Sequence, residues 1–191
     1  MATNVQLDQT KAAAFEGRLV EVLNAGALSL MVSIGHRTGL FDAMALLPPA
    51  TSIEIASRAQ LQERYVREWL GAMVAAGVVD YDAPSRAYRL PPEHAAYLTR
   101  AAAPSNFAVF AQYIPLLGSV EDDVVRCFGE GGGVPYARYG RFHEVMAEDS
   151  GQTVLPALKD HILPLVPGLI ERLEAGIRVL DVGCGRGRRS T

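Results

Sequence analysis

The sequence predicts a mostly helical chain with a small β-ribbon in its first half and one buried-type strand near its end. Apolar residues recur at helical intervals over most of the chain, and two short alternating segments flank the turn residues 82–85. The third observation is the stretch IRVLDVGCGRG, an apolar run that leads into a glycine loop. We expect a winged-helix N-terminal domain, a helical segment, and only the first strand and glycine loop of a Rossmann-like α/β domain.

The composition is that of a globular chain and argues against several classes of protein. Of the 191 residues 49% are hydrophobic, and the net charge of −3 gives no global positive field for nucleic acid or anionic lipid. Cys127 and Cys184 are too few for a disulfide framework or a metal site. No signal peptide is recognised, and no apolar segment reaches the ~20 residues that span a bilayer, so we expect a cytoplasmic protein without a membrane segment.

The first element expected is a long helix over residues 11–34. Its apolar residues cover more than one face, which is typical of a helix buried on two sides. We therefore expect a homodimer formed through this helix and the domain that follows. An ordinary buried helix is the alternative.

A short helix and a longer one form the body of the predicted winged helix. Thr51 or Ser52 caps the short helix, and Glu54 pairs with Arg58 one turn later. Its residues expected to face inward are Ile53, Ile55 and Ala56. The longer helix ends near Gly77, and its apolar stripes contain Leu61, Tyr65, Trp69 and Met73, with Val66, Leu70 and Val74 beside them.

The wing is the predicted pair of strands at 78–81 and 87–90. A wing invites a DNA-binding interpretation, but the charges on this face cancel: on the longer helix Glu63 and Glu68 balance Arg64 and Arg67. Affinity for duplex DNA depends on Lys and Arg that neutralise phosphates. The balance favours a structural or dimerising role over nucleic-acid binding.

The spacing of apolar residues over 91–176 predicts further helices. One begins at Pro91, and the next is expected to place Phe107 and Phe110 in the core. The loop GEGGGVPYARYG follows no strand, so flexibility is its expected use. The last helices are expected to break at Gly151 and near the prolines, and to end at Gly176. His36, His94 and His161 have no recognisable partners and are expected at the surface or at helix ends.

The glycine loop carries the chemistry. After the apolar run, Asp181, Gly183, Gly185 and Gly187 follow as D-x-G-x-G-x-G, whereas a dinucleotide site requires glycine where Arg188 stands. Glycines at this spacing let the backbone pack closely against a ligand without a pyrophosphate. S-adenosylmethionine fits that description.

VLDVGCGRG resembles the first motif of the class I S-adenosylmethionine-dependent methyltransferases, and the upstream order resembles a bacterial branch of them with a winged-helix dimerisation domain. The resemblance implies that Asp181, Gly183, Gly185 and Gly187 hold the cofactor, with Cys184 inside the loop. It further implies that helices before the strand cover the active site. The residues this would bring near cofactor or acceptor are Tyr136, Tyr139, Phe142, His143 and Met146, of which Tyr139 and Phe142 are our candidates for the cofactor.

The chain departs from the family after the glycine loop, where Arg188 to Thr191 replace the expected helix and later strands. We divide it into residues 1–100, 101–176 and 177–191, and expect a truncated, inactive N-terminal portion of a methyltransferase for a small-molecule acceptor. The catalytic residues and the acceptor atom, oxygen, nitrogen or carbon, stay open. The alternatives are a winged-helix transcriptional regulator, and a dimerisation or ligand-binding module without catalysis.

Overall fold

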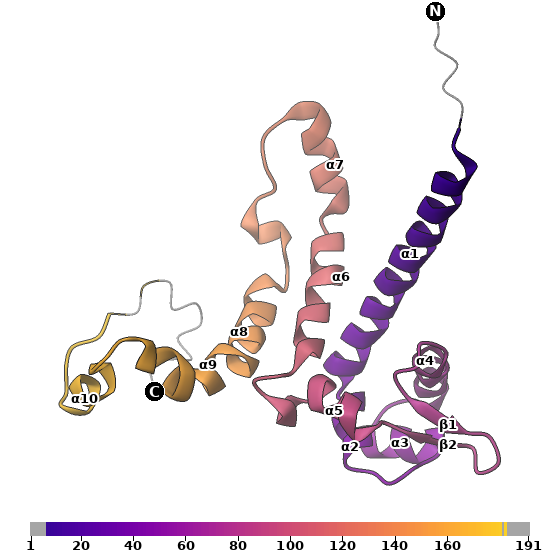
Figure 1. The fold of residues 1–191 in the computed structure, drawn as a ribbon, viewed down its shortest axis with the longest axis horizontal. Coiled ribbons are helices and arrows are strands. Elements are labelled where there is room, and N and C mark those ends of the chain that lie inside the picture. Colours follow the sequence, from indigo (N-terminus) through magenta and orange to yellow (C-terminus); the bar gives the residue numbers. More distant parts are fainter. Residues whose placement is uncertain (1–6, 181, 183–191) are drawn as a thin grey trace, which may run out of the picture.

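A computed structural model describes residues 7–180 and 182 (Figure 1). The helices of the first hundred residues are α1 (Gln9–Thr38), α2 (Leu40–Ala45), α3 (Ser52–Ala59), α4 (Glu63–Ala75) and α5 (Pro92–Leu98), with the antiparallel strands β1 (Asp80–Asp82) and β2 (Ala87–Arg89) between α4 and α5. Later elements are the short 3₁₀ turns η1 (Arg100–Ala102), η2 (Phe107–Gln112), η3 (Tyr136–Arg138) and η5 (Leu163–Leu165), a π-helical turn η4 (Leu158–Ile162), and α6 (Tyr113–Gly118), α7 (Glu121–Glu130), α8 (Phe142–Gln152), α9 (Val154–Ala157) and α10 (Leu169–Glu174). The predicted fold class is confirmed in its main parts, a mostly helical chain with one small ribbon.

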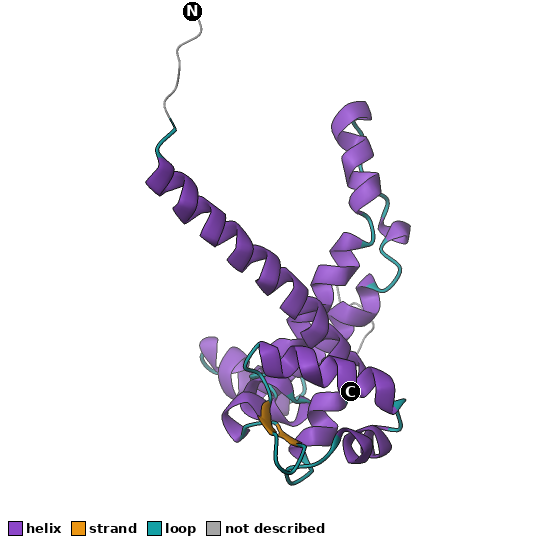
Figure 2. Cartoon of the chain, turned by 90° about the vertical axis from the view of Figure 1, so that its right-hand side faces the viewer, coloured by secondary structure: helices purple, strands orange, loops and turns teal. Residues whose placement is uncertain are grey.

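Helix α1 is longer than predicted, and only its C-terminal part packs on the domain. Asp8 caps its first turn, and Gly39, with φ of 73°, ends it in the left-handed conformation. Residues 13–27 are all exposed, and this part of the helix extends away from the rest of the chain in both views (Figures 1 and 2). The predicted burial on two sides is therefore absent within this chain.

The same helix corrects the expectation that no apolar segment is long enough to span a bilayer. By length and composition α1 passes that test, with a mean hydropathy of 1.4 over 18 residues, of which 17% are buried. Leucine, valine, isoleucine, methionine and alanine make the segment apolar on average, although polar residues such as Glu21 and Asn24 interrupt them. The core helix of a soluble protein and a signal sequence near the N-terminus pass the same test, so length and composition alone do not assign α1 to a bilayer.

The core lies where α1 ends and the winged helix begins. Phe41 and Trp69 meet edge to face with ring centroids 5.2 Å apart, and the Trp69 indole N–H donates to the Met31 carbonyl at 2.9 Å. Gly35 allows this approach, because a Cβ there would lie 2.5 Å from the Trp69 ring and 2.7 Å from that of Phe41. The wing adds a Tyr81–Tyr88 pair across its two strands.

Several details of the predicted winged helix are confirmed and others are wrong. Thr51 caps α3, but the Glu54 carboxylate accepts from Thr51 in a capping box, and no Glu54–Arg58 ion pair forms among the described residues. Ile53 and Tyr65 are 68% and 74% exposed, so neither faces the core. On α3 and α4, therefore, only part of each apolar stripe is buried, and the rest faces solvent.

The helical segment after residue 100 lies against α1 and then continues away from it. Turn η2 and helix α6 pack on α1, and α8 packs on η2 (Figure 1). Phe107 and Phe110 are 61% and 42% exposed, which contradicts their predicted place in the core. The break predicted at Gly151 occurs two residues later, at Thr153, where α8 ends and α9 begins.

The predicted strand at 177–182 does not form in the part that the structure describes. Residues 177–180 have no strand partner, and Val179, Leu180 and Val182 are 67%, 85% and 86% exposed. A buried-type strand needs neighbouring strands for its backbone groups and apolar faces. The described residues supply none at this position. Asp181 and residues 183–191, with the glycine loop, lie outside the described residues.

Candidate functional site

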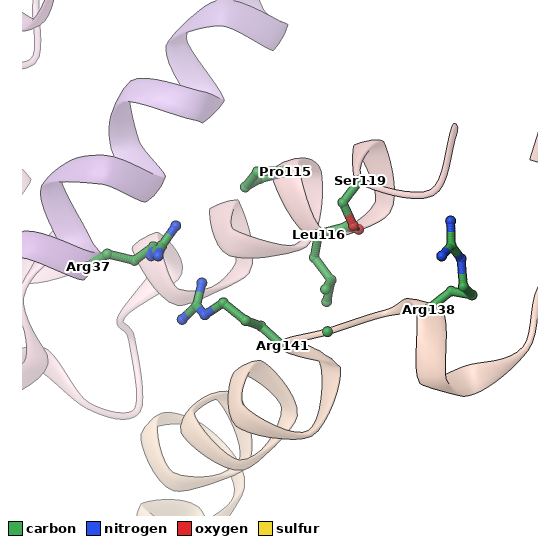
Figure 3. A pocket seen from close by; sticks show the side chains of 7 residues that line it. Arg37, Pro115, Leu116, Ser119, Arg138 and Arg141 are labelled. Carbon is green, nitrogen blue, oxygen red and sulfur yellow. The ribbon is translucent and has the colours of Figure 1, made fainter. Parts of the chain in front are cut away.

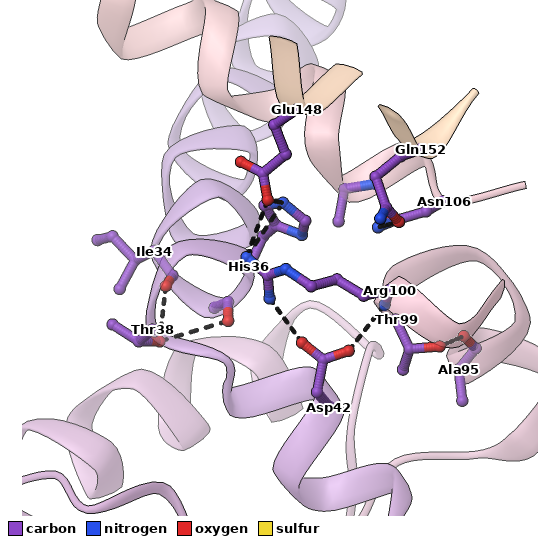
Figure 4. A network of polar contacts seen from close by, with 12 residues as sticks. Ile34, His36, Thr38, Asp42, Ala95, Thr99, Arg100, Asn106, Glu148 and Gln152 are labelled. Atoms are coloured by element: carbon purple, nitrogen blue, oxygen red, sulfur yellow. Dashed lines mark hydrogen bonds and ion pairs between the residues drawn. The ribbon is translucent and has the colours of Figure 1, made fainter. Parts of the chain in front are cut away.

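A partly buried polar network centred on Glu148 joins the winged-helix domain to the helical segment. The Glu148 carboxylate accepts from His36 Nε2 at 3.0 Å and Arg100 Nη2 at 3.0 Å through Oε1, and from Gln112 Nε2 at 2.8 Å through Oε2 (Figure 4). The four residues come from α1, η1, η2 and α8. One side chain therefore fixes α8 relative to three other elements.

Arg100 extends the network to α2. Its backbone N–H and Nη1 both donate to the Asp42 carboxylate, at 2.7 and 2.6 Å, while Nη2 reaches Glu148. Figure 4 shows the guanidinium lying between the two carboxylates. Fork-shaped donation of this kind fixes direction as well as distance, which a lysine could not reproduce.

The hydrogen-bond pattern assigns the proton on His36. A carboxylate only accepts, so Nε2 carries the hydrogen that is donated to Glu148. Arg100 Nη2, 3.5 Å from Nε2, is itself only a donor and cannot bond there. His36 Nδ1 is buried without a partner among the described residues. His36 lies in the last turn of α1, at a helix end as one of the two expectations had it, but it is 0% exposed and so does not lie at the surface.

These contacts shift the acid–base properties of the network. Hydrogen bonding from His36, against the opposing effect of burial and with help from Gln112 and Arg100, lowers the pKa of Glu148 to about 2. The neighbouring Tyr113 hydroxyl donates to Asp149 at 2.9 Å. Burial and that carboxylate raise the pKa of Tyr113 to about 12. Glu148 is thus an anion, and Tyr113 a neutral donor, across the physiological range.

The residues predicted to cover the active site include an aromatic cluster at the start of α8. The rings of Tyr136 and Phe142 meet edge to face with their centroids 5.3 Å apart, and Tyr136 stacks on His143 with a centroid distance of 6.3 Å. The ring centroids of Tyr139 and Phe142 lie 6.2 Å apart. Met146 lies on the same helix and is 43% exposed. Tyr136 is 69% exposed, so these rings form a surface cluster rather than a core.

Of the predicted cofactor residues, the structure brings together Tyr139 and Phe142. The others, Asp181, Gly183, Cys184, Gly185 and Gly187, lie outside the described residues. No group of three metal-ligating side chains occurs among the residues that are described. The network around Glu148 was missed because its members are separated by 36 to 112 residues and belong to no local motif.

Comparisons with known proteins agree with this architecture. A family model described as the Rv2258c-like winged HTH domain matches residues 26–100. Human N-acetylserotonin methyltransferase in complex with SAM is similar with a TM-score of 0.54 at 15% identity, over 93% of this chain and 65% of that one. The structure of the mitomycin 7-O-methyltransferase MmcR is similar with a TM-score of 0.51 at 15% identity, over 87% of this chain and 45% of that one. A comparison with curated proteins yields no match.

The similarity to solved structures concerns the fold, since the identities are low. The chain spans 38% of the length of PigF with SAH, another similar structure, which matches at a TM-score of 0.43 and 21% identity over 63% of this chain. The matched fold is a winged-helix domain followed by part of a methyltransferase-like fold.

Proposed function

Because residues 26–100 are a winged-helix domain of the Rv2258c-like type, we propose that this chain is the winged-helix and active-site-covering part of an S-adenosylmethionine-dependent methyltransferase for a small-molecule acceptor. The observation that carries the proposal is the combination of that domain with VLDVGCGRG at its expected place downstream. The folds of two methyltransferases, over 93% and 87% of this chain, support it.

The cofactor would supply a methyl group activated on a sulfonium. We assign its binding to the glycine loop, Asp181 to Gly187, and to the rings of Tyr139 and Phe142. The described residues fit this in one respect, since aromatic faces attract a cationic centre and stack on a purine. Methyl transfer of this kind depends mainly on orientation, and Glu148 would contribute by holding α8, which carries Phe142, in place.

The first test reads the coding sequence beyond the codon for Thr191 in all three frames. We expect one frame to continue with an apolar helix and a strand that ends in Asp or Glu, the residue type that binds ribose hydroxyls. The longer product should bind S-adenosylmethionine in calorimetry, and Gly185→Val should abolish binding because a branched side chain fills the space of the ligand. The absence of such a frame would contradict the proposal.

A second measurement separates this function from that of a transcriptional regulator. We expect weak binding of duplex DNA, because the ion pair between Arg67 and Glu63 and that between Arg89 and Asp80 neutralise cations on α4 and the wing. Tight binding with a steep dependence on salt concentration would favour the regulator instead.

A further inference from the structure

A pocket lined by three arginines lies between the end of α1, α6 and the segment that leads into α8. Its volume is about 350 Å³, and Arg37, Arg138 and Arg141 line it together with Pro115, Leu116 and Ser119. Among the residues that the structure describes, none of those lining it is acidic. A volume of this order is that of a site for a small organic molecule.

The arginines differ in how far acidic neighbours neutralise them. Arg138 donates through Nε to Asp123 at 2.7 Å, and Arg141 donates through Nε to Glu144 at 3.1 Å and through Nη2 to Gln112 at 3.3 Å. Arg37 forms no ion pair with any residue in the described part of the chain. Side-chain donors without a partner in the described part of the chain therefore remain on all three arginines: those of Arg37, Nη1 of Arg141, and Nη1 and Nη2 of Arg138, whose charge Asp123 offsets.

Figure 3 shows the guanidinium groups of Arg37 and Arg141 facing the same space at one end of the pocket, while Arg138 stands at the other end. Leu116 and Ser119 lie between the two ends. Two cations with no acid between them repel one another, and an anion in that space removes the repulsion. Guanidinium groups match a carboxylate through paired N–H donors.

We propose that this pocket binds a small organic anion, with its carboxylate between Arg37 and Arg141 and its apolar body against Pro115 and Leu116. The apolar wall distinguishes this ligand from a bare inorganic ion, which would gain nothing from it. The inference goes beyond the proposed methyl transfer and does not depend on it, because it is argued from residues that the structure describes and binding is measured without turnover. In a chain of net charge −3 the pocket is a local positive site.

Calorimetric titration of the full chain with benzoate tests the proposal, with neutral benzamide and inorganic phosphate as comparison probes. We expect saturable benzoate binding that weakens with added salt, and binding of benzamide weaker by about tenfold or more, since a charge-assisted pair contributes that much. Phosphate should not displace benzoate at equal concentration. Equal binding of benzamide, displacement by phosphate or no saturable binding of benzoate would each overturn the proposal.

Two substitutions on α1 locate the binding. Arg37→Gln should weaken benzoate binding by about tenfold, because it removes one of the two donors that hold the carboxylate. Arg18→Gln is the matched control, since it changes the same residue type on an exposed part of the same helix, away from the pocket. Both variants should keep the far-UV circular dichroism of the parent. Equal loss in the two variants would show that the effect is one of general charge and would overturn the assignment.

Discussion

Glu148 is the residue on which the polar network depends, and its ionisation links stability to pH. Its pKa is lowered from 4.5 to about 2, so its contribution is complete above pH 4.5 and is lost as the pH falls towards 2. We expect the free energy of unfolding to fall by on the order of 2 kcal/mol between pH 5 and pH 3 through this group alone. Urea titrations at the two pH values measure the loss.

Glu148→Gln should be less stable than the parent at pH 7, because three donors lose a charged acceptor, but its stability should fall less between pH 5 and pH 3. Glu144→Gln is the matched control on the same helix, since its carboxylate meets only the partly exposed Arg141. The control should follow the pH profile of the parent. Parallel profiles for all three proteins would show that Glu148 does not carry the effect.

Substitution of Gly35 and of Gly26 by alanine should change the stability of the protein in opposite directions, although both residues lie on α1. Gly35→Ala places a methyl group against the Trp69 and Phe41 rings, so we expect destabilisation of about 1–3 kcal/mol despite the gain in helix propensity. Gly26→Ala meets nothing within 4 Å and should stabilise the helix by up to about 1 kcal/mol. Thermal unfolding followed by circular dichroism measures both, and a stable Gly35→Ala protein would mean that the two rings can move apart.

At the scale of the element, the exposed apolar side of α1 is the feature that calls for a partner. It includes Phe15, Val22 and Leu23, which are 61%, 56% and 71% exposed. We propose a second copy of this chain as that partner. Leu23→Glu should raise the dissociation constant of the dimer by about a hundredfold or more, because a two-fold interface loses the buried side chain twice.

Sedimentation equilibrium checks this, with Val125→Glu on α7 as the control, since Val125 is exposed to a similar extent, 63%. The control should remain dimeric. A monomeric parent protein that sediments with phospholipid vesicles would contradict the dimer and assign α1 to a bilayer.

Caps, turns and helix ends could be predicted from the sequence because the residues that determine them lie close together in the chain. The cap at Thr51, the turn before Ala87 and the end of α4 near Gly77 follow from side-chain and glycine chemistry within a few residues. Ile53 and Phe107 were misplaced, because a helical stripe shows which residues share a face but not how much of it a neighbour covers. The contacts of Glu148 could not be predicted, since its partners meet only after the helices have packed.

At the scale of the whole molecule, burial is uneven. Trp69, the sole tryptophan, is 3% exposed in the core, whereas α7, α9 and α10 contain no buried residue. Elements with few buried contacts open at lower free energy than the core. We expect the helical signal at 222 nm to begin its loss at a lower temperature than the fluorescence of Trp69. Coincident transitions would instead show that the chain unfolds as one unit.

The carboxylate of Glu148 also restricts how this protein can be recombined with its relatives. The match to the winged-helix family ends at Arg100, yet Arg100 and His36 hold a residue of α8. A chimera that exchanges residues 26–100 for those of a relative would leave the partly buried Glu148 carboxylate with Gln112 alone of its three donors, unless the incoming domain places a histidine and an arginine at the same points. The domain should therefore be exchanged together with α8, and a stable hybrid is expected from a junction placed after α8.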